Sequence, residues 1–486
     1  KEIQLDAFGS IPGILSGVTL TQYNNSNSWH NEFRTNVLNQ IDEKLFKELY
    51  DKSMGAPNSS VRILLGMMII KEGFGYSDVE LYEQSRYNLL VRSALGLPNM
   101  SDQVPVESSY YSLRKRVVSY EKKTGVNLIE KIFDQVTSKQ VIAFEVSGRS
   151  IRMDSKLIGS NIANYSRYEI IHQSIVLFYK SLSDAQQSKL SEPEQKHLSL
   201  LSKEQGCKVV YRSTREEIKT QLQVLGTLMN SLLELFKGMQ TEPYQILWRI
   251  FQEQYQINQE QKIELMPKEK ITSDSVQSPH DTDCGYRKKD TQSVKGYSVN
   301  VSETCNEETL NLITNVQVEK ANTADNDFVE PAIEQSKEVL GQKIENAHAD
   351  GAYNSQSNTT YCKEESINFY LTGIQGSEGR YDLKPTEQGG IAVTDNQTGE
   401  AIPVKQTKSG KWKIKTEQGS RYFGTKEIES CQLRKQIANL PSEIKYKRNN
   451  VEATIFQLSL HNRNNKTKYR GMIKQKIFVL RKFYIH

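Results

Sequence analysis

The chain has 486 residues and a mass of 55.6 kDa, a length that predicts two to four domains and excludes a single small binding module. Apolar residues make up 37% of the chain and charged residues 25%, so it can bury cores despite a polar mean hydropathy of −0.61, and global disorder is excluded. The net charge is only +5 at pH 7, yet residues 441–486 carry eleven bases against two acids, which is typical either of a contact with a polyanion such as nucleic acid or of a solvated tail.

The N-terminal part, residues 1–135, is predicted to be an all-helical domain. The apolar run at 61–70 predicts a buried helix that ends at a pair of glycines, and Ser77 is placed to cap the helix that follows. A later helix, rich in Tyr and Arg, carries Arg114 and Arg116. Short helices joined by tight turns are compatible with a helix-turn-helix DNA reader. A plain helical bundle with solvated arginines is at least as common, so the pattern alone does not decide between them.

The composition changes near residue 140. Short apolar runs at 141–144 and 150–153 predict two strands, and the second leads directly into Asp154. Helices return over 161–265, where Thr214 begins a capping box and an apolar stripe at helical spacing follows it. We interpret this stripe as core or as a helix-pairing seam, so the segment is predicted to be a helical insertion without a ligand site.

Past the helical insertion the pattern turns to strands. Alternating or continuous apolar runs predict strands at 293–301 and 310–318, a helix over 325–340, a strand that ends in the carboxylate of Asp350, and a further strand at 367–371. This order of strands and helices predicts an α/β layout built on one mixed sheet.

The last quarter of the chain interrupts this layout once. Glycine turns and short alternating strands at 374–439 predict a small β insertion, and helices return at about 450–460 and from 471 onward. The α/β domain is therefore expected to be assembled from three separate segments, 140–160, 266–373 and 440–486.

Targeting and redox signals are weak. The sequence has no run of the roughly 18 apolar residues that a membrane-spanning helix needs and no apolar core of a signal peptide at its start, so we expect a soluble, cytoplasmic protein with no membrane partner. The five cysteines are scattered and form no Cys-x-x-Cys pair, which favours reduced thiols and indicates no zinc site.

Three acids are candidate metal ligands. Asp154 and Asp350 each follow an apolar strand, and carboxylates at strand ends of one sheet can share a divalent ion such as Mg²⁺, which prefers oxygen ligands. An aspartate at a strand end also commonly starts a turn, and the pattern alone favours that structural role. Glu452 lies one helical turn after Arg448 in the basic segment. It either holds a metal while its neighbours hold phosphates, or forms a surface ion pair worth only ~0.5 kcal/mol.

These residues resemble the Asp-Asp-Glu (DDE) transposases of bacterial insertion sequences, specifically the InsH-like group with a helical N-terminal domain. The likeness spans most of the chain and lies in four stretches: 61–116, like the N-terminal domain; 151–163 around Asp154, like the first catalytic strand; 347–353 around Asp350, like the second; and 448–452 with its basic sequel 468–471, like the Arg-x-x-x-Glu helix. The segment from Ser278 to Asp283 adds to the match. There we expect Asp281 and Asp283 to be structural or to contact DNA, and His280 to be a loop residue.

The resemblance implies a ribonuclease H-like catalytic domain, a mixed sheet flanked by helices, with an all-α N-terminal domain and two insertions. It implies that Asp154, Asp350 and Glu452 are catalytic and hold two Mg²⁺ ions, for which Mn²⁺ can substitute. It further implies a homodimer on double-stranded DNA that binds the element's terminal inverted repeats and target DNA and catalyses phosphodiester hydrolysis and strand transfer. The residues expected to contact DNA are Lys445, Arg448, Lys466, Lys468, Arg470, Arg114 and Arg116.

The sequence departs from the family pattern at two places. Ser459 stands where the family often has Lys or Arg, about seven residues after the glutamate, and Lys466 or Lys468 is a candidate substitute for that DNA contact. The second motif reads Asp-Gly-Ala-Tyr, which moves its glycine. The alternative reading is therefore a catalytically inactive or domesticated transposase-derived DNA-binding protein, and a host nuclease on the same fold is a third.

Overall fold

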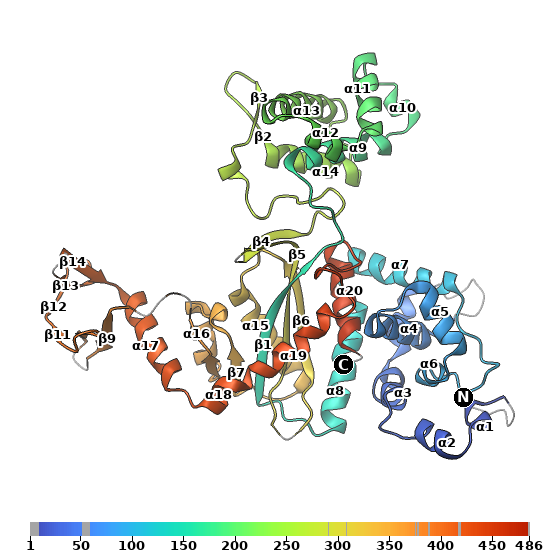
Figure 1. The fold of residues 1–486 in the computed structure, drawn as a ribbon, viewed down its shortest axis with the longest axis horizontal. Coiled ribbons are helices and arrows are strands. Elements are labelled where there is room, and N and C mark those ends of the chain that lie inside the picture. Colours follow the sequence, from blue (N-terminus) through green and yellow to red (C-terminus); the bar gives the residue numbers. More distant parts are fainter. Residues whose placement is uncertain are drawn as a thin grey trace.

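The computed structural model describes residues 9–50, 59–289, 291–307, 309–374, 376, 379–386, 389–416 and 419–484. A central mixed sheet is flanked by the N-terminal helices on one side, and two insertions project from it in different directions (Figure 1). No helix among these described residues is long and apolar enough to cross a membrane.

The N-terminal part is helical, as predicted. Ser60 caps α4, Gly75 ends it in the left-handed conformation at φ 74°, and Ser77 forms a capping box at the start of α5. The main helices are α4 (Val61–Phe74), α5 (Asp78–Tyr87), α6 (Leu89–Ala94), α7 (Glu107–Thr124) and α8 (Leu128–Ala143), and they follow the short α1 (Ile11–Ile14), α2 (Gly17–Tyr23) and α3 (Trp29–Glu32).

The strand predicted at 141–144 is wrong, because these residues belong to the end of α8. Val141 is buried and continues the helical stripe of Ile132 and Val136, whereas Ile142 is exposed. A run of four apolar residues does not distinguish a strand from the last turn of a helix, and here the preceding helical periodicity decides.

The central sheet has six strands and confirms the mixed α/β layout. Along its main path β5 (Gln292–Thr304) is followed by β1 (Ser150–Gly159), β7 (Asn346–Ala349) and β8 (Asn368–Leu371), and β6 (Ile313–Lys320) pairs with β5 off this path. β1 runs antiparallel to β5 and parallel to β7, and β7 runs parallel to β8. β4 (Gly285–Lys289) forms a hairpin with the first part of β5.

The two faces of the sheet are covered by different elements. On one face, Ile151 and Met153 of β1 pack in a core with the helix α15 (Val329–Leu340), near α16 (Gln356–Glu364). On the other, α19 (Asn449–Phe456) lies along β1, and α20 (Met472–Phe483) packs between β6 and α4. The C-terminal helix therefore joins the N-terminal helices to the same sheet face that carries α19 (Figure 1).

The first insertion is a helical unit with its own core. It contains α9 (Arg167–Ser181), α10 (Asp184–Gln187), α11 (Glu192–Lys203), α12 (Gly206–Arg212), α13 (Arg215–Leu235), α14 (Glu242–Gln254) and a hairpin of β2 (Tyr255–Ile257) and β3 (Ile263–Leu265). The predicted capping box at Thr214 is present, and the apolar stripe of α13 is buried in the core of this unit. The stripe is thus core, as interpreted from the sequence.

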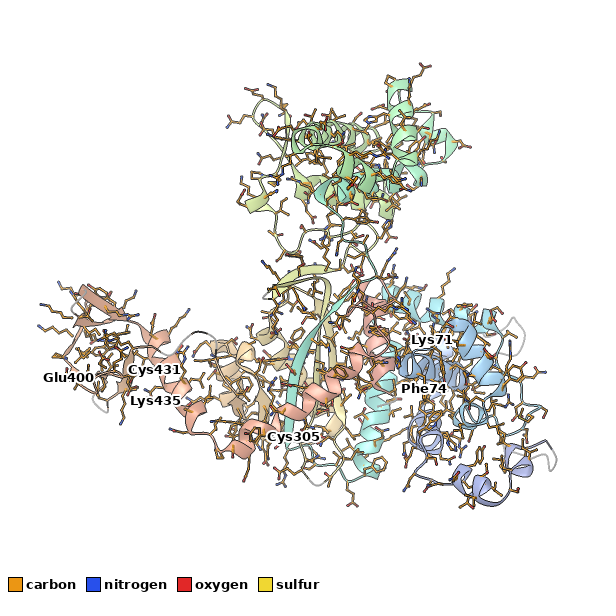
Figure 2. All side chains as sticks on the ribbon, viewed as in Figure 1. Lys71, Phe74, Cys305, Glu400, Cys431 and Lys435 are labelled. Atoms are coloured by element: carbon orange, nitrogen blue, oxygen red, sulfur yellow. The ribbon has the colours of Figure 1, made fainter. Side chains whose placement is uncertain are left out.

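The second insertion holds two three-stranded antiparallel sheets followed by a helix. One sheet contains β9 (Tyr381–Pro385), β10 (Ile391–Asp395) and β11 (Ala401–Ile402), and the other β12 (Val404–Gln406), β13 (Trp412–Thr416) and β14 (Gly419–Phe423). The helix α17 (Thr425–Asn439) was not predicted. Cys431 and Lys435 on α17 both contact Asp382 of β9, which fastens the helix to the first sheet (Figure 2).

Candidate active site

Asp154 lies inside a strand, not at its end. β1 continues from Asp154 to Gly159, and its parallel register with β7 pairs Ile151 with Ala347 and Arg152 with His348. Continuing this register by two residues places Asp154 beside Asp350, which directly follows β7. Because in-register neighbours on parallel strands point to the same face, the sheet brings the two predicted carboxylates together.

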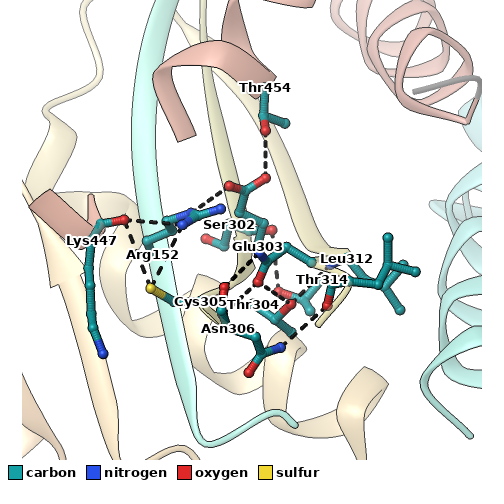
Figure 3. Close-up of polar contacts among 12 residues, drawn as sticks. Arg152, Ser302, Glu303, Thr304, Cys305, Asn306, Leu312, Thr314, Lys447 and Thr454 are labelled. Carbon is teal, nitrogen blue, oxygen red and sulfur yellow. Dashed lines mark hydrogen bonds and ion pairs between the residues drawn. The ribbon is translucent and has the colours of Figure 1, made fainter. Parts of the chain in front are cut away.

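The helix that carries Glu452 is tied to this face by a buried polar network (Figure 3). Arg152 donates from Nε to Oε1 of Glu303 at 2.6 Å and from Nη1 to the carbonyl of Lys447 at 3.2 Å. Thr454 of α19 donates its hydroxyl to the other oxygen of Glu303 at 2.6 Å. Both side chains of the Arg152–Glu303 pair are 5% exposed. The network therefore fixes the start and the middle of the helical segment against β1 and β5, with Glu452 between them.

Arg448 bridges the first and third predicted carboxylates. Its Nη1 lies 3.2 Å from Oδ2 of Asp154, and its Nη2 donates to Oε1 of Glu452. The Arg448 side chain is only 14% exposed, whereas that of Glu452 is 56% exposed. The sequence-predicted pair of Arg448 and Glu452 is thus present, and the same guanidinium also reaches Asp154.

The three acids influence one another electrostatically. Burial raises the pKa of Asp154 above its usual value, the charges of Asp350 and Glu452 raise it further, and Arg448 and the backbone N–H of Ser155 oppose the rise. The carboxylate of Asp350 accepts the N–H of Ala352 at 2.8 Å, which holds it at the start of a short 3₁₀ turn.

The donor atoms of Asp154, Asp350 and Glu452 suit a hard cation such as Mg²⁺, because all are carboxylate oxygens. Nevertheless, the described residues contain no group of three or more His, Cys, Asp or Glu side chains arranged to hold a metal ion. The Arg448 guanidinium contacts both Asp154 and Glu452. The metal assignment stays a prediction.

Sequence reasoning missed two bases on the same face of β1. Arg152 and Lys156 flank Asp154 at a spacing of two, the period at which strand residues share a face. Lys156 donates its ammonium to the hydroxyl of Ser459, and its Nζ lies 5.4 Å from the centre of the Phe456 ring. The spacing of these two bases is visible in the sequence. It indicates a shared face only if the strand continues beyond Asp154, which was not predicted.

Three of the predicted DNA-contacting bases gather where β1 ends. Lys466 forms a parallel bridge with Gly159 and donates its ammonium to the carbonyl of Ile162 at 2.9 Å. Arg470 donates from Nε to the carbonyl of Asn161 at 2.6 Å, and Lys468 between them is exposed. Lys445 on α18 (Ser442–Lys447) is partly buried and donates to the carbonyl of Ala438 at 3.0 Å.

The predicted DNA-contacting arginines of α7 are held by partners within the N-terminal helices. Arg114 lies over the rings of Tyr110 and Tyr111 and 3.7 Å from Asp78, and Arg116 lies 4.7 Å above the ring of Tyr50. These contacts explain both residues structurally. Their proposed contact with DNA stays a prediction.

The acids before β4 have structural partners, as expected for residues with a structural role. Asp281 is 3% exposed and accepts hydrogen bonds from the hydroxyls of Tyr297, at 2.6 Å, and Ser160. Asp283 accepts the backbone N–H of Met472 at 3.1 Å and so satisfies the start of α20. His280 lies in the loop, where burial lowers its pKa.

Comparison with known proteins points to one class for the N-terminal part. Residues 22–116 match the family model described as a transposase domain (DUF772). The match lies on the helices whose sequence resembles the N-terminal domain of transposases, and it supports a transposase, which confirms the sequence-based expectation at that level. Among curated proteins, none matches the sequence significantly.

One solved structure shows a weak likeness. It is the cryo-EM structure of the piggyBac transposase synaptic complex with hairpin DNA, which aligns with 94% of this chain and 73% of that chain at 8% sequence identity and a TM-score of 0.30. A likeness at this level carries no argument about fold or function.

Proposed function

We propose that the chain is a DDE transposase of a bacterial insertion sequence, with a ribonuclease H-like catalytic domain built on the central sheet. It binds the terminal inverted repeats of its element as a homodimer in the cytoplasm, hydrolyses the phosphodiester at each end, and joins the freed 3′-hydroxyl to target DNA. The observation that supports the proposal is that the β1–β7 register sets Asp154 beside Asp350 and that Arg448 contacts both Asp154 and Glu452, in a chain whose N-terminal part matches a transposase domain.

In this proposal Asp154, Asp350 and Glu452 hold Mg²⁺ or Mn²⁺. When bound, the metal ions would activate the attacking water or 3′-hydroxyl and stabilise the leaving oxygen. The chain supplies position, because the Arg152–Glu303 network holds the Glu452 helix against β1. Arg448 neutralises Asp154 and Glu452 in the free protein. A phosphate that arrives at the site competes for this guanidinium and releases the two carboxylates.

The test uses a duplex whose sequence is taken from the inverted repeats that flank the gene. The full chain is incubated with this duplex and Mg²⁺ or Mn²⁺, and the products are resolved as nicked, joined or merely shifted DNA. Glu452→Gln is expected to abolish nicking and joining while the DNA still shifts. Glu443→Gln, which changes an exposed acid in the same basic segment, is the matched control and should cleave normally. Cleavage by Glu452→Gln at the normal rate would show that the third ligand is assigned wrongly.

A second candidate is a transposase-derived protein that binds DNA without cleaving it. It is favoured by Ser459 in place of a base and by the Arg448 bridge, which occupies the space between two of the acids. The same assay separates the two functions, since this protein shifts the duplex and leaves both strands intact with either metal. A nuclease of the same fold would instead cleave duplexes without regard to the repeat sequence.

A further inference from the structure

The second sheet of the β insertion carries an unusual excess of positive charge. Between residues 404 and 423, which span β12, β13 and β14, the sequence has six bases and one acid. This surplus is local, since the whole chain has a net charge of only +5.

The alternation of the strands places three of these lysines on one face. Ile414 of β13 is 1% exposed and Phe423 of β14 is 7% exposed, and both point into the small core of the insertion. Lys413, Lys415 and Tyr422 alternate with them and point the other way. Arg421 pairs with Ile414 and therefore lies on the side of the core. The cross-strand register therefore sets Lys405 beside Lys413, Lys413 beside Tyr422, and Lys415 beside Ser420 on the outward face.

This face carries charges that no acid among the described residues pairs with. Like charges directly opposite each other on neighbouring strands destabilise a sheet, and Lys405 and Lys413 are such a pair. Among the described residues, no carboxylate forms an ion pair with Lys405, Lys413 or Lys415. Tyr422 is 50% exposed, and its ring lies 5.5 Å from the ammonium of Lys413. A bound anion would supply the missing negative charge.

We propose that this face, defined by Lys405, Lys413, Lys415 and Tyr422 and called the β13 face, binds the phosphate backbone of duplex DNA. Lys413 and Lys415 are two residues apart on one strand, so their Cα atoms are separated by about 6.8 Å. This distance equals the rise along the helix axis for two phosphate steps of one DNA strand. Lys405 broadens this row by one strand spacing of about 4.8 Å. The array therefore fits a continuous line of phosphates better than one isolated phosphate.

The aromatic content of the face favours a duplex over a single strand. Single-strand binders use several rings as stacking platforms for successive bases. Among the described residues of the β13 face, Tyr422 is the exposed ring, and it is already engaged by Lys413. The inference deepens the proposed function, because a transposase must hold DNA outside its active site, but its test measures binding alone.

The test compares the full chain with Lys405→Ala/Lys413→Ala/Lys415→Ala in duplex binding by fluorescence anisotropy, between about 50 and 200 mM salt. Each lost phosphate contact is expected to reduce the slope of log Kd against log salt by about one, so the triple variant should lose about three. A triple Lys→Arg variant at the same positions keeps the charge and should keep the slope. The matched control, Lys203→Ala/Lys208→Ala/Lys219→Ala, removes three exposed lysines from the helical insertion and should also keep it.

An unchanged slope in the triple alanine variant, with its melting temperature intact, would overturn the proposal. So would a chain that binds no duplex but binds polyglutamate through these same lysines, because the partner would then be an acidic peptide. The outcome is separable from the proposed function. If the triple alanine variant has a reduced slope but the original chain never cleaves DNA, the β13 face is supported and the transposase activity is refuted. If the original chain cleaves DNA but the slope of the variant is unchanged, the transposase activity is supported and the β13 face is refuted.

A different observation assigns a role to Lys156. We infer that its ammonium contacts a phosphate of the DNA that lies across Asp154. Lys156 lies on the same face of β1 as Asp154, the face along which α19 lies. Its ammonium contacts the Ser459 hydroxyl and the Phe456 ring of the C-terminal segment. Among the described residues, its direct partners are thus neutral, and no carboxylate lies within ion-pair distance of it. The charge is positioned by the fold and remains available to a substrate anion.

The test for Lys156 exploits its contact with Ser459. Lys156→Met should weaken duplex binding about tenfold and reduce the salt slope by about one, as expected for one phosphate contact. Lys156→Arg should retain both. Lys156→Met/Ser459→Lys returns an ammonium to the same place from the other side of the contact and should restore the slope, which a merely structural role would not predict. An unchanged slope in Lys156→Met, or no recovery in the double variant, would overturn the inference.

Discussion

The buried pair of Arg152 and Glu303 offers a strong test of how the candidate site is held together. Arg152→Ala removes the base and leaves the Glu303 carboxylate nearly enclosed, with the Thr454 hydroxyl as its one remaining polar partner among the described side chains. It also removes the shorter of two hydrogen bonds to the carbonyl of Lys447, which keeps the contact from the Cys305 thiol at 3.9 Å. The variant should therefore lose both stability and the attachment of the Glu452 helix.

The expected loss of stability is large. Removing one partner of a buried ion pair costs about 3–5 kcal/mol, because the remaining charge is left without compensation. With a urea slope of about 3 kcal/mol per molar, this corresponds to a midpoint lowered by about 1–2 M for the transition that contains the sheet. An exposed pair such as Lys262 and Glu260, with both side chains about 70% exposed, should change the midpoint little when Lys262 is replaced by Ala.

The double variant Arg152→Met/Glu303→Leu separates the two effects of the pair. Replacement of a buried ion pair by apolar side chains of similar volume is often neutral or stabilising, so its urea midpoint should return most of the way to that of the original chain. DNA cleavage should stay low, because Thr454 has lost the Glu303 carboxylate and the Lys447 carbonyl has lost its hydrogen bond from Arg152. A double variant as unstable as Arg152→Ala would refute the reasoning, since the loss would not then come from the unpaired carboxylate.

Three further predictions concern other parts of the sheet and its helices. Burial raises the pKa of Asp134 to about 7, so between about pH 4 and about pH 7 the folded chain holds a proton that the unfolded chain has lost. The free energy of unfolding should therefore fall over this pH range, by at most about 4 kcal/mol. Asp134→Asn should remove this fall when urea unfolding at about pH 5 is compared with that at about pH 8. Gly296→Ala places a Cβ 2.1 Å from the carbonyl oxygen of Ile158 and should destabilise the sheet by about 1–3 kcal/mol or more in the same measurement, and a neutral result would contradict the close approach of β1 and β5. Arg448→Met removes the base that lowers the pKa of Asp154, so the acid limb of the pH–cleavage profile should move to higher pH; a profile that does not move would contradict the bridge.

Local patterns predicted most elements of the sheet, but not where β1 ends. The polar residues Asp154, Ser155 and Lys156 break the apolar run, and they were expected to lie outside the strand. In the structure β1 continues to Gly159, because β5 pairs with it along its whole length and satisfies its backbone. Such pairing depends on residues more than a hundred positions away, which the local pattern does not contain.

The same distinction applies to the candidate site. Asp154, Asp350 and Glu452 were found from short motifs, and the register of β1 with β7 brings the first two together. The roles of Arg152 and Glu303 were not predicted, because each is understood only when the strands pair and α19 docks on them. The β13 face was also missed. In the sequence its lysines show only the alternation of charged and apolar residues that is common in strands. The cross-strand register is needed to place them side by side.

The residues of β1 that face α19 explain how the strand that carries Asp154 is connected to the helix that carries Glu452. Three alternate residues of this strand each meet a different point of the C-terminal segment. Arg152 meets the carbonyl of Lys447, Asp154 meets the Arg448 guanidinium, and Lys156 meets the Ser459 hydroxyl. Along the face the charges alternate as base, acid and base, and each has its own partner: Glu303 for Arg152, Arg448 for Asp154 and the Ser459 hydroxyl for Lys156. Under the proposed function, a phosphate that draws Arg448 away changes the charge balance of Asp154, while the Arg152–Glu303 pair still holds the helix against β1.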